Sequence, residues 1–373
     1  MRKHIRLTPG TGRFLLIAAC AFTLLPTGAW AWSLAAISSN GNILAFDYSP
    51  ASGFTLAPGG TRAAGSAPID VSVGKASGGN DVEIVVLRDG GAGNDMIDVY
   101  RFAGGQWTLV ASGNCGVTDA KAIGVTMTHL GTETPIIAVL IDNGADADTF
   151  AGFEVSGSGL AVVQEPAAFG GSFAGDYSGF SAGQIEQIGA GPPMGGDPEK
   201  LNVAFGRILP DGRNAITYAQ FRPLHISPVY LTPRGDRTDP AEAIGATSLD
   251  FGNFGEYPAD PPDYIVGAGG NYAENIVAWW TVPQGKGDQG AMGRNDVGEP
   301  VIDVTGMNLD ADALDEIAYL TAGKIGTLIP TGQEGPMDVG PSTVNVYQII
   351  KIDGIRAGER GVSSVDNWER LRY

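Results

Sequence analysis

The loop from Asn308 to Glu316 carries the residues whose types and spacing are best suited to chemistry. Its oxygen ligands would be the side chains at positions 1, 3, 5 and 9 and the backbone carbonyl at position 7, which are Asn308, Asp310, Asp312, Glu316 and Leu314. Alternating oxygens let a tight loop surround a hard cation such as Ca²⁺. An Asn at the first position and alanines in place of glycines depart from the usual pattern. The loop therefore predicts a structural calcium site, with a metal-free acidic turn as the alternative.

Three other motifs give weaker signals. Residues 179–183 match the nucleophile-elbow pattern, but no amphipathic helix follows and only His225 lies downstream. We interpret the acidic stretch 142–148 as a solvated turn between two strands. His129 and His225 are the only histidines after residue 31, so imidazole-based zinc sites and most His acid–base schemes lack parts. No catalytic residue is predicted, although carboxylates are numerous enough for a glycosidase-like pair.

The elements that must position these residues are short strands in a repeated order. Helical periodicity is nearly absent after the N-terminal segment, and β-branched and aromatic runs alternate with Gly, Asp, Asn and Pro clusters. The opening strands are Ile69–Val73, Ile123–Met127, Ile185–Ile188, Ile244–Ser248 and Ile302–Gly306. More apolar second strands follow them at Glu83–Leu87, Ile136–Leu140, Leu201–Phe205, Tyr264–Gly267 and Ile317–Leu320. Third strands include Ile97–Phe102, Ile276–Trp280 and Val344–Tyr347. Four-stranded units at a long period are typical of β-propeller blades.

The two ends of the repeat are incomplete in complementary ways. Leu34–Ile37, Ile43–Tyr48 and Phe54–Ala57 resemble second, third and fourth strands without an opening strand. Gly361–Val365 resembles an opening strand with nothing after it, and it continues the spacing of the repeat. We predict that it pairs beside Leu34–Ile37 and closes the ring, because an open sheet edge invites aggregation.

The predicted fold is therefore an all-β propeller with six four-stranded blades, and seven blades is the alternative. A single domain spans residues 32–373. Its predicted blades are 32–66 together with 361–373, 67–113, 114–168, 169–238, 239–298 and 299–360. Trp279 and Trp280 are adjacent on a strand and point to opposite faces, so one is expected to pack between blades and the other to lie at a rim or form a binding platform.

Two blades carry a loop pattern that resembles a known family. Leu249-Asp250-Phe251-Gly252-Asn253, with Asp263–Gly267 after an inserted loop, and Met307–Ala318 resemble the blades of FG-GAP/VCBS-type propellers, which include the integrin α-subunit head. The resemblance implies a propeller architecture. It implies little about function, since propellers serve as adhesins, lectins, enzymes and scaffolds.

The N-terminus has the order of a signal peptide. Basic residues up to Arg13 precede an apolar run from Phe14 to Leu25, and Ala29-Trp30-Ala31 fits the peptidase pattern, so cleavage is expected before Trp32. The alternatives are lipidation at Cys20 and an uncleaved anchor. The predicted destination is the periplasm, the cell surface or the medium, with no membrane span after cleavage.

The net charge limits which partners are possible, and the cysteine content limits which disulfides are possible. Residues 1–31 hold four Lys+Arg and no carboxylate, so 19 Lys+Arg would face 41 Asp+Glu in the mature chain, a net charge near −22. This charge disfavours nucleic acid and anionic lipid. Cys115 is the only cysteine after residue 31, which excludes an internal disulfide and predicts a small buried apolar residue.

The sequence thus predicts an exported, acidic, non-enzymatic binding or scaffold protein. Its loops would face a protein or polysaccharide partner, and calcium would brace one blade. The alternative is a carbohydrate-active enzyme that uses carboxylates in the central funnel of the propeller.

Overall fold

The repeated apolar runs form buried strands in the computed structural model. The structure describes residues 32–125, 135–141, 149–168, 184–191, 201–208, 214–221, 232–237, 248–252, 264–268, 274–281, 291–309, 315–329, 337–338 and 348–356. These residues form strands and connections and contain no helix. Accordingly, the described part of the chain has no helix long and apolar enough to cross a membrane.

The described strands pair into antiparallel sheets of four. In hydrogen-bonded order, three sheets are β24(Ile349–Gly354)-β1(Leu34–Ser38)-β2(Asn42–Ser49)-β3(Gly53–Ala63), β4(Pro68–Gly74)-β5(Glu83–Arg88)-β6(Met96–Ala103)-β7(Gln106–Asn114) and β8(Ala120–Val125)-β9(Ile137–Ile141)-β10(Thr149–Ser156)-β11(Gly159–Ala168). The other three are β12(Gln184–Gly191)-β13(Leu201–Ile208)-β14(Asn214–Phe221)-β15(Thr232–Arg237), β16(Ser248–Gly252)-β17(Tyr264–Ala268)-β18(Ile276–Thr281)-β19(Ala291–Asp296) and β20(Val301–Met307)-β21(Glu316–Thr321)-β22(Ile325–Ile329)-β23(Met337–Asp338).

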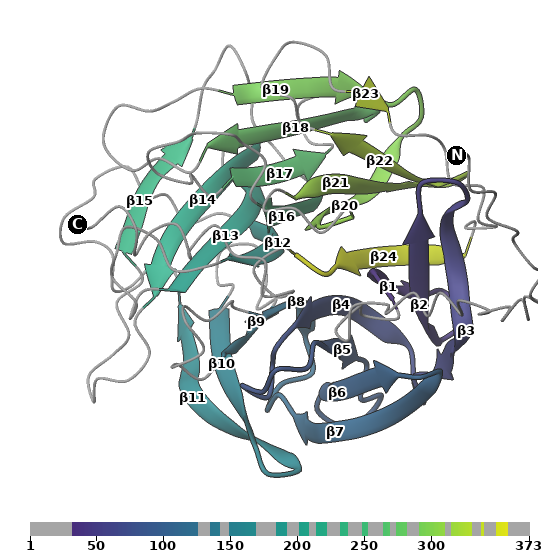
Figure 1. Ribbon diagram of the computed structural model, residues 1–373. Coiled ribbons are helices and arrows are strands. Elements are labelled where there is room, and N and C mark those ends of the chain that lie inside the picture. Colours follow the sequence, from purple (N-terminus) through teal and green to yellow (C-terminus); the bar gives the residue numbers. More distant parts are fainter. Residues whose placement is uncertain are drawn as a thin grey trace, which may run out of the picture. The chain divides into compact units, whose positions relative to one another are not determined.

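The sheets are arranged in a ring that resembles a β-propeller. Figure 1 shows the first strand of each order toward the middle of this ring and the last strand toward its periphery. We call β4, β8, β12, β16, β20 and β24 the inner strands. Each inner strand contacts the next one in this sequence, and β24 contacts β4. The all-β, propeller-like prediction is therefore confirmed.

Apolar side chains are buried between neighbouring sheets, so a single sheet on its own would expose them to water. The second strands β5, β9 and β21 are buried almost throughout, as their continuous apolar character predicts. One core cluster joins β5 and β6 to β8 and β9, and it includes Cys115, which is 3% exposed as expected for a small apolar residue. Another joins β20–β22 to β1–β3 and β24. In these described clusters, apolar faces of one sheet are thus covered by the neighbouring sheet.

The sheet that unites the two ends of the chain confirms one expectation and corrects another. β1, β2 and β3 are the second, third and fourth strands of a composite sheet, as predicted. Its inner strand, however, is β24, so the prediction that Gly361–Val365 pairs beside Leu34–Ile37 is wrong. Both edges of β1 are occupied, by β2 and by β24. Residues 361–365 lie outside the described residues.

The same correction moves the boundary of the last predicted blade. In the sheet that begins with β20, β22 is the third strand, a position that the sequence analysis gave to Val344–Tyr347. Residues 349–354, predicted to end the blade 299–360, belong to the composite sheet instead. The last repeat is short because β22 and β23 have only five and two residues. A constant repeat length therefore placed the closing strand too far along the chain.

Candidate functional site

Polar side chains of four inner strands form two layers between the sheets. In each strand the two residues are two positions apart, so both project from the same face. We call them the axial layers. The first layer consists of Ser248, Asp303, Lys351 and Asp70, and the second of Asp250, Thr305, Asp353 and Ser72. All of these residues except Lys351 are buried.

Backbone N–H groups of the following strand donate to both layers, to every residue of the second layer and to every residue of the first except Lys351. In the first layer, Ser248 Oγ accepts from Val304 N at 2.9 Å, Asp303 Oδ2 from Ile352 N at 2.8 Å, and Asp70 Oδ2 from Ile123 N at 2.9 Å. In the second, Asp250 Oδ2 accepts from Gly306 N at 2.9 Å, Thr305 Oγ1 from Gly354 N at 3.0 Å, Asp353 Oδ2 from Val73 N at 2.6 Å, and Ser72 Oγ from Val125 N at 3.1 Å. The buried amides at these junctions are thereby satisfied.

Two cationic side chains, one in β24 and one just after it, offset the negative charge of the axial carboxylates. Lys351 Nζ lies 3.6 Å from Asp303 Oδ1, and Arg356 Nη1 lies 3.6 Å from Asp250 Oδ1. Burial acts to lower the pKa of Lys351, but the carboxylates of Asp303 and Asp70 raise it above its usual value. Lys351 therefore stays charged. A buried carboxylate cluster of this size requires such compensation.

Two of the axial carboxyl groups titrate near neutrality. Burial raises the pKa of Asp70 to about 7, although Lys351 opposes the shift. Burial, together with the negative charge of Asp250, raises the pKa of Asp353 to about 7. Both groups are consequently protonated in a large fraction of molecules at pH 7.

The contacts of Thr305 agree with a proton on Asp353. Thr305 Oγ1 lies 2.9 Å from Asp250 Oδ2 and 2.8 Å from Asp353 Oδ1, yet its single hydroxyl hydrogen serves one acceptor at a time. If Asp353 is protonated, it donates to Thr305, and Thr305 donates to Asp250. All three groups then have a partner.

A carboxyl group with a raised pKa beside a second carboxyl group, as Asp353 stands beside Asp250, is also what acid–base catalysis uses. Asp250 and Asp353 are only 8% and 7% exposed, however, and each accepts a backbone N–H from the next strand. The arrangement holds strands together and offers a substrate little access. This cluster was not predicted from the sequence, although the alternation Ile69-Asp70-Val71-Ser72-Val73, repeated at Ile302–Gly306, was a usable signal.

The proposed calcium loop joins β20 to β21, and its two ends are described. Met307 pairs with Glu316, so Asn308 and Glu316 stand at opposite ends of the loop. Asn308 is fully buried, and Glu316 Oε2 accepts from Leu309 N at 2.7 Å. Asp310, Asp312 and Leu314 lie outside the described residues. Two of the five predicted ligands, Asn308 and Glu316, are therefore described, and they stand at the two ends of the loop.

The loop between β4 and β5 has a glutamate at the position that corresponds to Glu316, but it lacks the alternating oxygen residues of the predicted calcium loop. Gly74 pairs with Glu83, which occupies the same register position as Glu316. Glu83 is fully buried and accepts from Ser77 N at 3.1 Å, from Ser77 Oγ at 2.6 Å and from Arg101 Nη2 at 2.9 Å. A carboxylate at the start of the second strand thus caps the preceding loop in both sheets.

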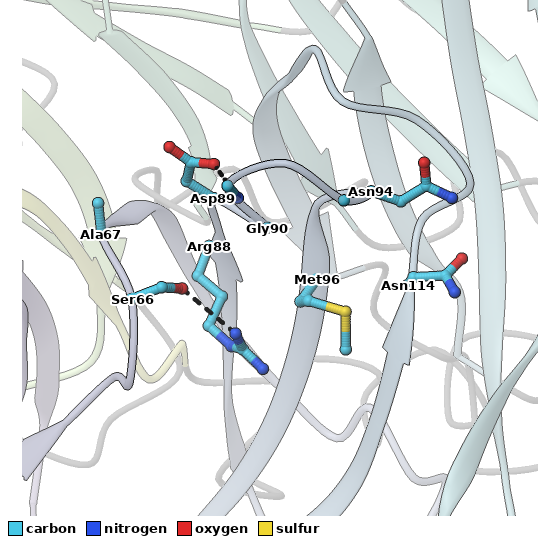
Figure 2. Close-up of a pocket in the computed structure, with 10 residues that line it drawn as sticks. Ser66, Ala67, Arg88, Asp89, Gly90, Asn94, Met96 and Asn114 are labelled. Atoms are coloured by element: carbon cyan, nitrogen blue, oxygen red, sulfur yellow. Dashed lines mark hydrogen bonds between the residues drawn. The ribbon is translucent and has the colours of Figure 1, made fainter.

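A polar pocket of about 530 Å³ opens where the connection before β4, the β5–β6 loop and the end of β7 meet. Figure 2 shows the Arg88 guanidinium between Ser66 and Met96. Arg88 Nε donates to Asp98 Oδ2 at 2.6 Å and Nη1 donates to Ser66 Oγ at 3.2 Å. The side chains of Asn94 and Asn114 also line the pocket. No sequence motif pointed to it, because its residues come from separate segments: the connection before β4, the β5–β6 loop with the strand ends beside it, and the end of β7.

The remaining predicted positions divide between core and undescribed residues. Trp279 is 2% exposed and packs with Val301 and Val304 of the next sheet, which confirms that one tryptophan of the pair lies between blades. Four other predicted positions lie outside the described residues: the stretches 142–148 and 179–183, His129 and His225.

Comparison of the chain with protein-family models gives no match, and comparison with curated proteins gives none either. The resemblance to FG-GAP/VCBS propellers stays a prediction.

Proposed function

We propose that this chain is an exported, non-enzymatic binding or scaffold protein that presents propeller loops to a protein or polysaccharide partner. The internal use of the axial carboxylates supports this function most directly. Asp70, Asp250 and Asp353 are buried and accept backbone N–H groups, so they serve the fold rather than a substrate. The exposed chemistry lies in the loops, where binding residues of rigid scaffolds usually stand.

The proposed scaffold is a closed ring of six blades. Its support is the set of six four-stranded sheets, the succession of contacts between inner strands, and the pairing of β24 with β1. A closed ring leaves no inner sheet edge exposed, which suits a protein that functions outside the cytoplasm without disulfides.

Export with cleavage before Trp32 belongs to the same proposal. The Trp32 side chain is 1% exposed, and its Nε1 donates to Phe102 O at 3.0 Å. Ser33 N donates to Phe46 O at 2.7 Å. Cleavage before Trp32 would therefore keep the first residues that are anchored in the domain.

The experiment uses the protein exported from the full-length gene and cell envelopes of the organism that makes it. N-terminal sequencing should give Trp32 first. In sedimentation assays the protein should bind the envelopes saturably and release neither soluble sugar nor peptide. Absence of saturable binding would overturn the proposed function.

A carbohydrate-active enzyme is the second candidate, because Asp250 and Asp353 form a carboxyl pair bridged by Thr305. The same envelope assay separates the two functions. Release of reducing sugar by the unmodified protein, abolished by Asp250→Asn, would favour the enzyme. An Asp119→Asn variant, changed at an exposed carboxylate, is the matched control.

Calcium bracing is proposed for the β20–β21 loop, with Asn308, Asp310, Asp312, the Leu314 carbonyl and Glu316 as the oxygen donors. Calcium should raise the melting temperature of chelator-treated protein, because a ligand specific to the folded state stabilises it by about 2.7 kcal/mol at a hundredfold excess over Kd. The double variant Asp310→Ala/Asp312→Ala should remove this shift, whereas Asp119→Ala should retain it. Identical melting curves with calcium and with chelator would refute the site.

A further inference from the structure

The pocket described above has a rigid polar wall. The β5–β6 loop is braced internally, because Asp95 Oδ1 accepts from Gly90 N at 3.1 Å and Asp95 Oδ2 from Ala120 N at 2.9 Å. A Cβ at Gly90 would lie 1.9 Å from Asn94 O, so the loop closes too tightly for any other residue. Arg88 is held by Asp98 and Ser66. The wall is therefore organised before any ligand arrives, which limits the entropy lost on binding.

Several hydrogen-bonding groups of this wall face the pocket. Arg88 uses Nε and Nη1 in the contacts above, which leaves Nη2 for a ligand. Asn94 is exposed, and Asn114 uses only Oδ1, which accepts from Gly116 N at 3.1 Å. Asp89 adds a second acceptor, and Met96 adds a partly buried apolar surface. The lining thus offers donors, acceptors and one apolar side chain.

The charges around the pocket select against an anionic ligand. Among the described residues that line it, Arg88 is the only cation, and Asp98 already lies 2.6 Å from Arg88 Nε. Asp89 lines the pocket, and buried Asp95 braces its loop. One guanidinium therefore stands against three carboxyl groups. A phosphate or carboxylate would gain little here, whereas neutral hydroxyl groups can use both donors and acceptors.

We propose that this pocket binds a residue of a neutral polysaccharide, an inference that rests on the proposed binding function and specifies its partner. Sugar hydroxyls would bond to the Arg88 guanidinium, the Asn94 and Asn114 amides and the Asp89 carboxylate. The C–H face of the sugar ring would lie on Met96. A volume of about 530 Å³ is within the usual range for small-ligand sites.

Affinity electrophoresis of the exported protein in gels containing dextran, laminarin, xylan or galactomannan tests this site. At least one of these neutral glycans should retard the protein. Ala67→Phe, which fills the pocket from an exposed position, should weaken the affinity for that glycan at least tenfold. Asn94→Ala, which removes an exposed amide, should weaken it about fivefold. Asn80→Ala, an exposed residue in the β4–β5 loop at the other end of β5, should leave it unchanged.

The outcomes separate this inference from the proposed function. Retardation that is equal in all three variants, each with an unchanged melting temperature, would overturn the pocket assignment. Saturable envelope binding without retardation by any of the four glycans would overturn it too, while the proposed function would stand. If Ala67→Phe failed to fold, Asn94→Ala against Asn80→Ala would still decide the matter.

Discussion

Removing residues 348–373 should leave a chain that does not fold at 25 °C, in contrast to a chain that ends at Arg356. The difference between the two truncations is β24 and its flanks. Ile349, Ile352 and Ile355 are 4%, 4% and 0% exposed, and burying them contributes about 6 kcal/mol, at roughly 2 kcal/mol each. That amount is comparable with the entire stability of a typical domain, about 5–15 kcal/mol.

Hydrogen bonds add to this expected loss. Without β24, β1 would present an unpaired edge in the composite sheet. Val73 N would lose its acceptor Asp353, and Asp303 would lose the N–H of Ile352. Each buried polar group left without a partner costs about 1–3 kcal/mol. The loss therefore spreads to β4 and β20, on both sides of the composite sheet.

Circular dichroism and thermal melting of the two truncated proteins measure the effect. A synthetic peptide of residues 348–356, added in excess to the shorter chain, should restore strand signal and a cooperative transition. A peptide with Ile352→Asp is the matched control and should not. Equal melting temperatures for the two truncations would show that β24 is dispensable.

The sequence predicted that the composite sheet takes its inner strand from the C-terminal part of the chain, but it did not identify that strand. The out-of-phase start at Leu34 showed that an inner strand had to come from elsewhere. The strand itself was misplaced because the spacing of earlier opening strands was carried past β22 and β23, which are shorter than their counterparts. β24 was also hard to recognise because it has Lys351 in the first axial layer, at the position where β4 and β20 have aspartates.

The axial layers and the pocket were out of reach for a different reason. Asp353 and Val73 are 280 positions apart, and only the ring of inner strands brings them together. A single Asp in a strand is compatible with a solvated position, so its burial could not be inferred. The pocket likewise combines Ser66 from the connection before β4 with Arg88 and Asn114 from the ends of β5 and β7. Local patterns predict strands well, whereas these contacts depend on which strands become neighbours.

The axial carboxyl groups should make the protein less stable as the pH rises from about 4 to about 7. The pKa values of Asp70 and Asp353 are raised to about 7 in the folded state, from 3.8. Between these values the folded state retains protons that the unfolded state releases, so unfolding becomes easier with rising pH. Each group contributes on the order of 4 kcal/mol across this window, and nothing further above it. The charged groups that face them are Asp250, Asp303, Lys351 and Arg356.

Asp353→Asn isolates this contribution, because an amide keeps two contacts of the protonated carboxyl: it accepts from Val73 N through oxygen and donates to Thr305 through nitrogen. The contact that Asp353 Oδ1 accepts from Gly354 N at 2.8 Å is lost, but Gly354 N also donates to Thr305 Oγ1 at 3.0 Å. The variant should match the unmodified protein near pH 4 and exceed its free energy of unfolding at pH 8 by up to about 4 kcal/mol. Urea unfolding at pH 4, 6 and 8 provides the comparison, with Asp119→Asn as the exposed control. Other carboxylates add their own pH dependence, which cancels in the difference between variant and unmodified protein. If Asp353→Asn were less stable than the unmodified protein at pH 8, Asp353 would function as a charged partner of Arg356, and the neutral network through Thr305 would be refuted.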